Sequence, residues 1–432
     1  MKNALPALKF ILRFIARSTV RRYRPRIVGV TGSVGKSSTK EALGVVLGHE
    51  RRVRAPSKSF NNEIGLPLTL IGSWIKTGGV YFWLKVIGTG LSGLILKKPE
   101  YPEVIVLEYG VDRPGDMKYL LDIARPEIGI FTAMGDVPVH VEFFNGPEGI
   151  LREKSKLISQ LPSTGFAVLN IDDPMVWGLR DQTRAQVMSF GFSKDADVRI
   201  NNFVHHYEGD SVITSFKLEY GGSVVPVRLE NVLGKGQAYA AAGAAAIGLI
   251  FGMNLVAIAE SLRNYRPPQG RLTVIRGIKE SIIIDDSYNA SPLAMREALT
   301  MLKELKAKRK IAVLGDMLEL GKYTLGAHTE VGELTAKTAD LLITVGLRGK
   351  LIAEAAARSG FPKKSISVFM SVSEAGLFLQ NKLQPNDLVL IKGSQGVRME
   401  RIVQEVMAEP MRAPELLVRQ DKEWLGKPGL YE

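Results

Sequence analysis

Short runs of apolar residues alternate with amphipathic helical patterns from Ile27 to about Gly270. The runs RIVGVTG, EVIVLEYG, EIGIFTAMG, FAVLNIDD and VMSFGF each end at or beside glycine, aspartate or a hydroxyl residue, where a loop is expected to begin. Strands that alternate with helices are typical of a parallel, doubly wound sheet. The pattern therefore predicts an α/β domain over residues 26–270.

Two further patterns belong to the same domain. Residues 197–230 alternate apolar and polar positions with a period of two across glycine-rich turns, which predicts a small antiparallel β meander. The segment AYAAAGAAAIGLIFG then predicts a buried, alanine-rich helix.

A second α/β pattern follows a linker. In NYRPPQGRL, residues 264–272, paired prolines disfavour both helix and strand. Beyond it the runs SIIIDDSYNASP, KIAVLGDMLELG, LLITVG, SISVFM and DLVLIKGSQG again end in polar or glycine residues. Open α/β sheets place their binding sites at such strand ends. We therefore expect a Rossmann-like C-terminal domain over residues 271–432.

The segment TGSVGKS, from Thr31 to Ser37, lies between an apolar run and a predicted helix. Glycines allow backbone N–H groups to converge on phosphate oxygens, and the start of the helix adds its dipole. Lys36 would then reach the β- and γ-phosphates of a nucleotide, and Ser37 would hold Mg²⁺. The common pattern has a glycine five positions before Gly35, where this chain has Val30. The segment predicts a P-loop but does not identify a reaction.

Charge and composition limit the classes of partner and of chemistry that we expect. The 432 residues carry a formal net charge of +13, which favours anionic ligands. We interpret this charge as spread along the chain rather than gathered in one aromatic-studded block, so no nucleic acid partner is expected. The chain has no cysteine, which excludes disulfides, cysteine-ligated zinc and thiol nucleophiles and is compatible with a reducing cytoplasm.

Two segments are candidates for contact with a membrane surface. Residues 1–25 predict a basic amphipathic helix, with Lys9, Arg13 and Arg17 on one stripe and Leu8, Ile11, Leu12 and Ile15 on another. Such a helix either lies on an anionic membrane or packs on the body of the protein with its arginines in water. Residues 74–98 are apolar and aromatic, and favour a core or interface helix over an element that dips into a membrane.

Six segments carry a family resemblance. TGSVGKSSTKE, SFNNEIGLPLTL, LEYGVDRPGDM, IIDDSYNASPLAMREAL, VLGDMLELG and IKGSQGVRMERIV resemble the Mur ligases in order and spacing, over about residues 27–410. The branch they resemble adds D-alanyl-D-alanine to a muramoyl tripeptide. The resemblance implies an ATP-dependent ligase of cell-wall precursor synthesis. In such an enzyme a carboxylate becomes an acyl phosphate, which the amine of an amino acid or dipeptide then attacks.

The resemblance also implies a metal and catalytic set. Lys36 matches the phosphate lysine, and Ser37 matches the first magnesium ligand. Glu108 matches a carboxylate that helps to hold magnesium, and His140 matches a histidine near a second metal ion. The cofactors implied are ATP and two Mg²⁺ ions.

Lys154 matches the lysine that carries a CO₂-derived carbamate in these ligases, with Lys156 as the competing candidate. A carbamate forms only from a neutral amine, so the pKa of this lysine would have to be lowered.

Further binding residues follow from the same resemblance. The nucleotide contacts implied are Thr31, Gly32, Ser33, Val34, Gly35, Lys36, Ser37, Ser38, Gln237, Arg271, Asp286, Tyr288 and Asn289. The substrate contacts implied are Asn61, Asn62, Lys392, Ser394 and Arg398, although turn asparagines also serve the backbone alone. The chain departs from the family at Ala133, where asparagine is usual, and at Gly236 and Gln237, which replace a His-Asn pair.

Three alternatives stay open. Only 31 residues precede Gly32, too few for the uridine-binding domain that the resembling ligases carry there, so the acceptor could be lipid-linked and the protein membrane-associated rather than purely cytoplasmic. A folylpolyglutamate-type ligase is a second alternative. A catalytically silent nucleotide-binding scaffold is the third.

Overall fold

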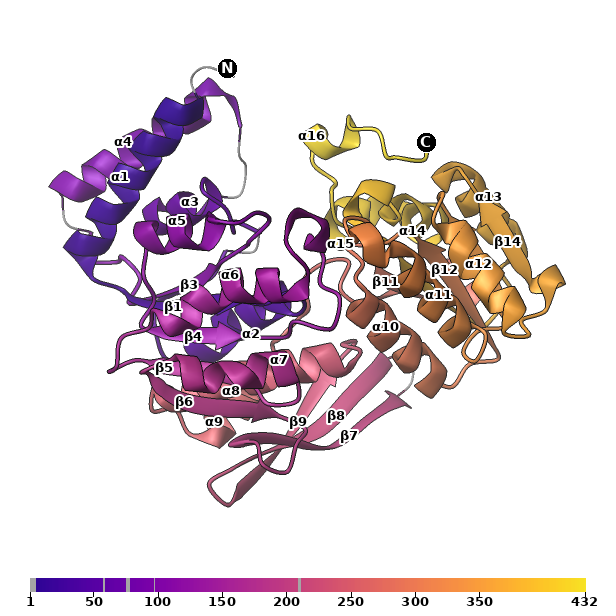
Figure 1. Ribbon diagram of the computed structural model, residues 1–432, viewed down its shortest axis with the longest axis horizontal. Helices are drawn as coiled ribbons and strands as arrows, with labels where there is room; N and C mark the ends of the chain where they lie inside the picture. The colour runs from indigo at the N-terminus through magenta and orange to yellow at the C-terminus, as the bar shows by residue number, and fades with distance from the viewer. Residues whose placement is uncertain (1–4, 57–58, 75–77, 97, 209–210) are drawn as a thin grey trace.

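Two β-sheets organise the described part of the chain, which comprises residues 5–56, 59–74, 78–96, 98–208 and 211–432 of a computed structural model. Within these residues the first sheet has nine strands in the order β2-β3-β1-β4-β5-β6-β7-β8-β9, and the second has six in the order β10-β11-β15-β12-β13-β14. Figure 1 shows the first sheet in indigo to pink and the second, beside it, in orange to yellow. The predicted α/β fold is confirmed.

The first sheet is parallel from β2 to β7 and antiparallel from β7 to β9. The predicted meander thus continues the parallel sheet instead of forming a separate one, because β7 pairs with β6 at Phe190–Val198. The strands are β1 (Arg26–Thr31), β2 (Val53–Arg54), β3 (Val104–Glu108), β4 (Ile128–Phe131), β5 (Phe166–Asn170), β6 (Gln186–Gly191), β7 (Val198–Glu208), β8 (Ser211–Tyr220) and β9 (Ser223–Glu230).

Helices cover both faces of this sheet, and the strands between them read as continuous apolar runs for that reason. In β1, Val28 and Val30 pack with α2 and α8, whereas Ile27 packs with the helices of the opposite face. One face carries α2 (Lys36–Gly48), α8 (Lys235–Ile250) and α9 (Leu255–Leu262). The other carries α3 (Gly65–Ile71), α5 (Asp116–Ile123), α6 (Pro147–Ser159) and α7 (Pro174–Trp177).

The second sheet begins after the proline-containing linker. Its first strand is antiparallel to β11 and the others are parallel. The strands are β10 (Thr273–Arg276), β11 (Ile282–Asp286), β12 (Arg309–Gly315), β13 (Leu341–Val345), β14 (Ile366–Phe369) and β15 (Asp387–Lys392). Its helices are α10 (Pro292–Glu304), α11 (Thr324–Thr335) and α12 (Gly349–Arg358) on one face and α13 (Val372–Lys382) and α14 (Glu400–Val406) on the other, followed by α15 (Ala413–Leu416) and α16 (Lys422–Leu425).

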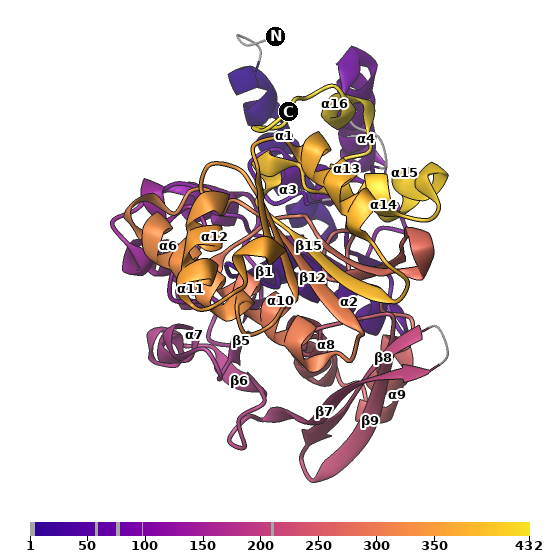
Figure 2. The same cartoon turned by 90° about the vertical axis from the view of Figure 1, so that its right-hand side faces the viewer.

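The N-terminal helix α1 (Leu5–Tyr23) packs on α3 and on α4 (Gly79–Ile95). Both views show α1 and α4 at the same end of the first sheet (Figures 1 and 2). The predicted arrangement of the stripes is partly wrong. Lys9 and Arg13 turn toward the body and pair with Glu63 and Asp122, while Ile11 is exposed. Residues 1–4 of this segment lie outside the described residues.

Helix α4 falls within the 74–98 segment, of which residues 75–77 and 97 lie outside the described part. It is not a core helix, because only Phe82, Val86, Gly90 and Gly93 are buried. Among the described residues no helix is both long and apolar enough to cross a membrane.

The contact between α1 and α4 depends on a glycine. A Cβ atom on Gly90 would lie 2.4 Å from Cγ2 of the buried Ile15, whereas a Cβ on Gly88 would meet nothing within 4 Å. Alanine stabilises a helix by about 0.5–1 kcal/mol relative to glycine. The same substitution therefore has opposite consequences at positions two residues apart.

We predict that Gly88→Ala raises the free energy of unfolding by about 0.5–1 kcal/mol, whereas Gly90→Ala lowers it by about 1–3 kcal/mol because it overpacks the helix contact. Denaturant unfolding, with hydrogen exchange of α1 as the local readout, measures both. Equal effects of the two variants would contradict this packing.

Candidate active site

The P-loop joins β1 to α2 and its backbone is held by the neighbouring strand. The amides of Ser33 and Val34 donate to the Ala133 carbonyl at 2.7 and 3.3 Å. Gly32 has a φ of 140°, and a Cβ there would lie 2.2 Å from Oγ1 of Thr132. Only glycine fits, because both the backbone conformation and the space exclude a side chain.

Helix α2 starts at Lys36, with Gly35 as a left-handed cap residue that supplies no side-chain cap. A helix start of this kind presents backbone N–H groups and the positive end of the dipole. Lys36 Nζ donates to the carbonyls of Gly32 and Ser33, at 2.9 and 3.3 Å. Burial lowers the pKa of Lys36, and the Glu108 carboxylate opposes this shift.

Glu108 ends β3 and lies directly beside this helix start. Its Oε2 accepts from the Ser37 hydroxyl at 3.2 Å and lies 3.6 Å from Lys40 Nζ, and its Oε1 accepts from Asn61 Nδ2 at 3.4 Å. Burial by itself would raise the pKa of Glu108, but the charges of Lys40 and Lys36 outweigh it and the net shift is downward. The site therefore holds a buried, ionised carboxylate.

Lys154 is buried on α6, close enough to Lys36, Asp112 and Glu108 to interact electrostatically. Burial and the Lys36 charge lower the pKa of Lys154 to about 7, against the opposing effect of nearby carboxylates. Lys156, the competing candidate, instead pairs with Glu153 at 2.5 Å and is about one-third exposed. Of the two candidates for the carbamate, Lys154 and Lys156, only Lys154 has the buried environment that favours a neutral amine.

The imidazole of His140 contacts Asp112 and Glu319 rather than Glu108. The Nδ1 atom lies 2.6 Å from Glu319 Oε2 and the Nε2 atom 3.3 Å from Asp112 Oδ1. Because Glu319 follows β12 of the second sheet, this contact links the two domains. His140 and Glu319 both have positive φ angles, 71° and 62°, a conformation that in non-glycine residues marks strain often found at functional sites.

Within the described residues, no three His, Asp or Glu side chains gather as ligands for a metal ion. The predicted metal ligands lie in two groups, since Ser37 contacts Glu108 whereas His140 contacts Asp112 and Glu319. Ser37 and Glu108 remain as a pair of oxygen donors.

At the junction of the two domains, Asp286 pairs with Lys392 at 2.6 Å, and both side chains are buried. Burial raises the pKa of Asp286, opposed by the Lys392 charge, and burial lowers the pKa of Lys392. The Arg271 guanidinium lies 4.2 Å from the centre of the Tyr288 ring. The structure thus brings these four predicted residues together from the linker and the ends of β11 and β15.

Several other predicted residues have their polar atoms engaged within the protein. Asn62 Oδ1 accepts from the amides of Ile64 and Gly65 at the start of α3, so it serves the backbone. Asn289 Oδ1 accepts from Ala290 N and Gln395 N. Both Oδ1 atoms are thus engaged by backbone amides, and the roles of Asn62 and Asn289 as ligand contacts stay predictions.

Gln237 is also held by the chain. Its Oε1 accepts from the Tyr265 hydroxyl at 2.5 Å and its Nε2 donates to the Arg271 carbonyl at 3.2 Å. The side chain is buried, and its role in adenine recognition stays a prediction.

The two remaining substrate candidates, Ser394 and Arg398, are buried as well. Ser394 Oγ accepts from Leu318 N at 2.9 Å. Arg398 donates to Glu400 and to the carbonyls of Trp424 and Lys427, so the C-terminal tail covers it. Arg398 therefore holds the C-terminal tail, and its role as a substrate contact stays a prediction.

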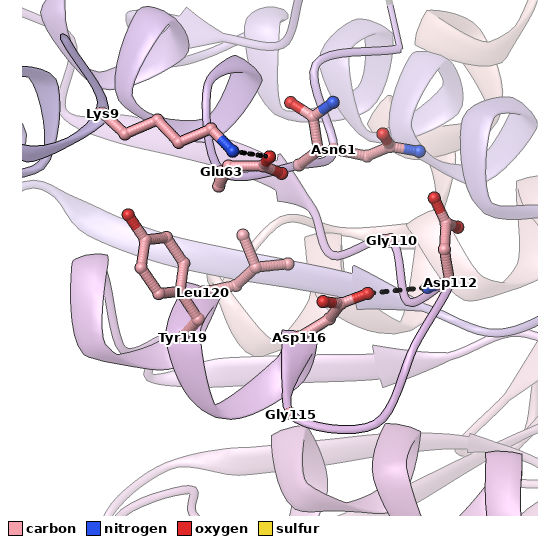
Figure 3. A pocket seen from close by; sticks show the side chains of 10 residues that line it. Lys9, Asn61, Glu63, Gly110, Asp112, Gly115, Asp116, Tyr119 and Leu120 are labelled. Atoms are coloured by element: carbon pink, nitrogen blue, oxygen red, sulfur yellow. Dashed lines mark hydrogen bonds and ion pairs between the residues drawn. The ribbon is translucent and has the colours of Figure 1, made fainter. Parts of the chain in front are cut away.

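A pocket of about 380 Å³ opens beside Asn61 and extends to α1 (Figure 3). Lys9 reaches into its rim and pairs with Glu63 at 2.7 Å, while Asp116 accepts from the Asp112 amide at 3.0 Å. Its lining comprises Lys9, Asn61, Asn62, Glu63, Gly110, Asp112, Gly115, Asp116, Tyr119 and Leu120. Because Asn61 also touches Glu108, the pocket leads from the carboxylate site toward the N-terminal helix.

Four residues of the site, Lys40, Asp112, Asp116 and Glu319, are not among those predicted from the sequence. A signal existed for Lys40, which follows Lys36 by one helical turn and so lies on the same face of α2. Asp112, Asp116 and Glu319 lie within the quoted segments LEYGVDRPGDM and VLGDMLELG, but their contacts depend on long-range folding.

We predict that Lys40→Met lowers the free energy of unfolding at pH 7 by about 3–5 kcal/mol, because it leaves Glu108 buried with less compensation. In this variant the pKa of Glu108 rises, so the cost is present above the unfolded pKa and shrinks as the pH falls and Glu108 binds a proton. Denaturant unfolding at pH 7 and pH 5 measures it.

Lys156→Met is the matched control, since its pair with Glu153 is partly exposed and should contribute about 1 kcal/mol or less. Equal costs for the two variants, or a cost that grows at low pH, would contradict the role of Lys40.

Comparison with known proteins identifies the domains. The Mur ligase middle domain matches residues 87–248, and the Mur ligase, glutamate ligase domain matches residues 270–395. The UDP-N-acetylmuramoyl-tripeptide–D-alanyl-D-alanine ligase of Bacillus subtilis (strain 168) is 29% identical over 402 residues, which are 93% of this chain and 80% of that protein. The ligase of the same name from Escherichia coli (strain K12) is 28% identical, covering 89% and 77%.

Solved structures agree with this result. MurF from Acinetobacter baumannii superposes with a TM-score of 0.75 at 26% identity, covering 94% of this chain and 80% of that one. MurF ligase from Thermotoga maritima, in complex with ADP, gives a TM-score of 0.73 at 27% identity, covering 92% and 83%. This chain therefore contains the middle and C-terminal domains of a Mur ligase and belongs to that family of ATP-dependent ligases.

Proposed function

We propose that this protein is a MurF-type ligase, which uses ATP to join D-alanyl-D-alanine to the terminal carboxylate of a muramoyl tripeptide. The observation that carries the proposal is the cluster of Lys36, Glu108 and Lys154 at the P-loop, beside a pocket large enough for part of a peptide. Two relatives that are named for this reaction match this chain over 80% and 77% of their own length.

The chemistry has two balanced steps. An acceptor carboxylate oxygen attacks the γ-phosphorus of ATP, ADP leaves, and an acyl phosphate forms. The amine nitrogen then attacks the acyl carbon, phosphate leaves, and the nitrogen loses a proton to give the amide. Because the carboxylate and the triphosphate repel each other, the reaction depends on cations placed between them.

Lys36 supplies one such cation, and the donor set fits Mg²⁺ as another. Ser37 and Glu108 offer a hydroxyl and an ionised carboxylate, the oxygen ligands that Mg²⁺ prefers, and Mg²⁺ usually keeps several waters of its own. We propose that these two residues hold the ion. When bound, it would neutralise charge on the phosphates during transfer.

Lys154 is proposed to carry a carbamate. The uncharged amine would add to CO₂ with loss of a proton, and the product would convert a cation near Glu108 into an anion. A pKa of about 7 supports this, since a substantial fraction of the amine is then neutral near pH 7.

We infer that the second domain contributes to nucleotide binding from the junction. Arg271 would reach the phosphates, and Asp286 and Tyr288 would lie beside the ribose or base, because these groups gather where the two domains meet. Lys392 would act by positioning Asp286, and Ser394 by holding the loop after β15.

A lipid-linked acceptor is a second form of the same function. We call the pocket beside Asn61 the acceptor-side pocket. A lipid-linked acceptor is favoured by Lys9, which lines this pocket and belongs to α1, a helix with exposed apolar residues. The folylpolyglutamate alternative has only fold-level support, because the synthase of Mycobacterium tuberculosis is 16% identical. A catalytically silent scaffold is disfavoured, because burying the ionisable groups of Glu108 and Lys154 destabilises the folded protein and a scaffold does not require them.

We expect phosphate release with ATP and Mg²⁺ only when both UDP-N-acetylmuramoyl-tripeptide and D-alanyl-D-alanine are present, with the amide product seen by mass spectrometry. Lys36→Ala should reduce turnover by at least about a thousandfold, because the developing charge on the transferred phosphoryl group loses its cation. Lys364→Ala, at an exposed lysine between α12 and β14, serves as the control. Phosphate release without either partner, or none at all, would contradict the proposal.

Lys154→Ala should lose activity that a small carboxylate such as acetate partly restores, whereas Lys156→Ala should retain it. With ¹³C-bicarbonate, a carbamate resonance should grow between pH 6 and pH 8, because the neutral amine increases as the pH rises through a pKa of about 7. A resonance that persists in Lys154→Ala, or its absence at pH 8, would overturn the carbamate assignment.

A further inference from the structure

Helix α4 exposes a nearly continuous apolar stripe. Tyr81, Leu84, Leu91 and Ile95 lie on one helical face, and their exposed fractions are 80%, 63%, 45% and 77%. The opposite face packs on α1 through Val86 and Gly90. An isolated exposed leucine needs no explanation, but a stripe along a whole helix marks a surface that contacts something else.

Helix α1 adds a second such stripe at the same end of the molecule. Phe10 and Phe14 are one turn apart and are 72% and 60% exposed, although Leu12 and Ile15 on the inner face are already buried. The Arg22 guanidinium donates to the Ile95 carbonyl, and the Tyr23 hydroxyl donates to the Gly93 carbonyl, so the two helices form one unit. We call Phe10, Phe14, Tyr81, Leu84, Leu91 and Ile95 the α1–α4 surface.

The net charge of the protein is concentrated in the same two segments. Residues 1–24 and 64–99 together hold 11 of the 57 lysine and arginine residues and none of the 44 aspartate and glutamate residues. These segments carry a charge of +11 against +13 for the whole chain, so the net charge is uneven along the sequence although most lysine and arginine residues lie elsewhere. Arg21, Arg22 and Lys85 are exposed beside the apolar stripes.

We propose that the α1–α4 surface docks on an anionic lipid bilayer. Exposed phenylalanine, leucine and isoleucine would enter the interfacial region, and the surrounding cations would meet lipid phosphates. A protein partner or a second copy of this chain would meet the apolar stripes equally well. The complete absence of acidic residues from both segments favours lipid, because a second copy would place the exposed cations Arg21, Arg22 and Lys85 against like charges in its own interface.

Docking would also orient the active site. Lys9, on α1, pairs with Glu63 at the rim of the acceptor-side pocket (Figure 3). The pocket therefore reaches the body-facing side of the helix that carries Phe10 and Phe14 on its outer side, and the consequence of docking, a membrane-proximal acceptor, rests on the proposed function. The docking itself does not.

The test is co-sedimentation of the full chain with vesicles, in the absence of ATP. We expect binding to phosphatidylcholine vesicles that contain roughly a third phosphatidylglycerol, little binding to phosphatidylcholine alone, and weakening as salt rises. Leu84→Ser with Ile95→Ser should weaken binding about tenfold or more, since two apolar side chains leave the interface.

The matched control is Leu325→Ser with Val256→Ser, which are 62% and 55% exposed on other helices and should bind like the unaltered protein. Ligase activity on a water-soluble acceptor should be unchanged in both double variants, so a failure of docking and a failure of the proposed function are distinguishable. No binding to anionic vesicles, equal binding to neutral ones, or self-association through Leu84 and Ile95 without lipid would each overturn the proposal.

Discussion

The site depends on one electrostatic arrangement, a buried carboxylate that stays ionised because cations from a single helix face it. Glu108 ends a strand, and Lys36 and Lys40 occupy successive turns of α2 beside it. Without those charges, burial would favour the protonated acid, which binds no metal ion. The parallel order β3-β1-β4 brings the strand end, the P-loop and Thr132 to the same edge of the sheet.

The second domain lies on one side of this edge of the sheet, and the acceptor-side pocket lies on the other. The second domain contributes Arg271 and the buried Asp286–Lys392 pair at the junction, and Glu319 reaches across to His140. On the other side, the acceptor-side pocket runs from Asn61 toward α1. A nucleotide and an organic acid can thus approach the same point from opposite directions, which is what an acyl-phosphate mechanism requires.

Much of this arrangement could be predicted from sequence, because it depends on local signals. The apolar runs located the strands, and TGSVGKS located the P-loop. Gln237 and Arg398 show where this reasoning stops: their in-chain partners, Tyr265 and the tail after Trp424, lie 28 and 26 residues away. The outward apolar stripe of α1 was also missed, since helical periodicity cannot tell which of two apolar faces finds a packing partner.

In the proposed reaction the acceptor carboxylate takes the γ-phosphoryl group before the amine attacks it. The direct measurement is turnover with an acceptor whose reacting carboxylate carries ¹⁸O at both oxygens, followed by mass spectrometry of the released phosphate. We expect one ¹⁸O atom in each phosphate, because the oxygen that attacks phosphorus leaves with it when the amide forms. Phosphate that contains only solvent and ATP oxygen would contradict an acyl-phosphate intermediate.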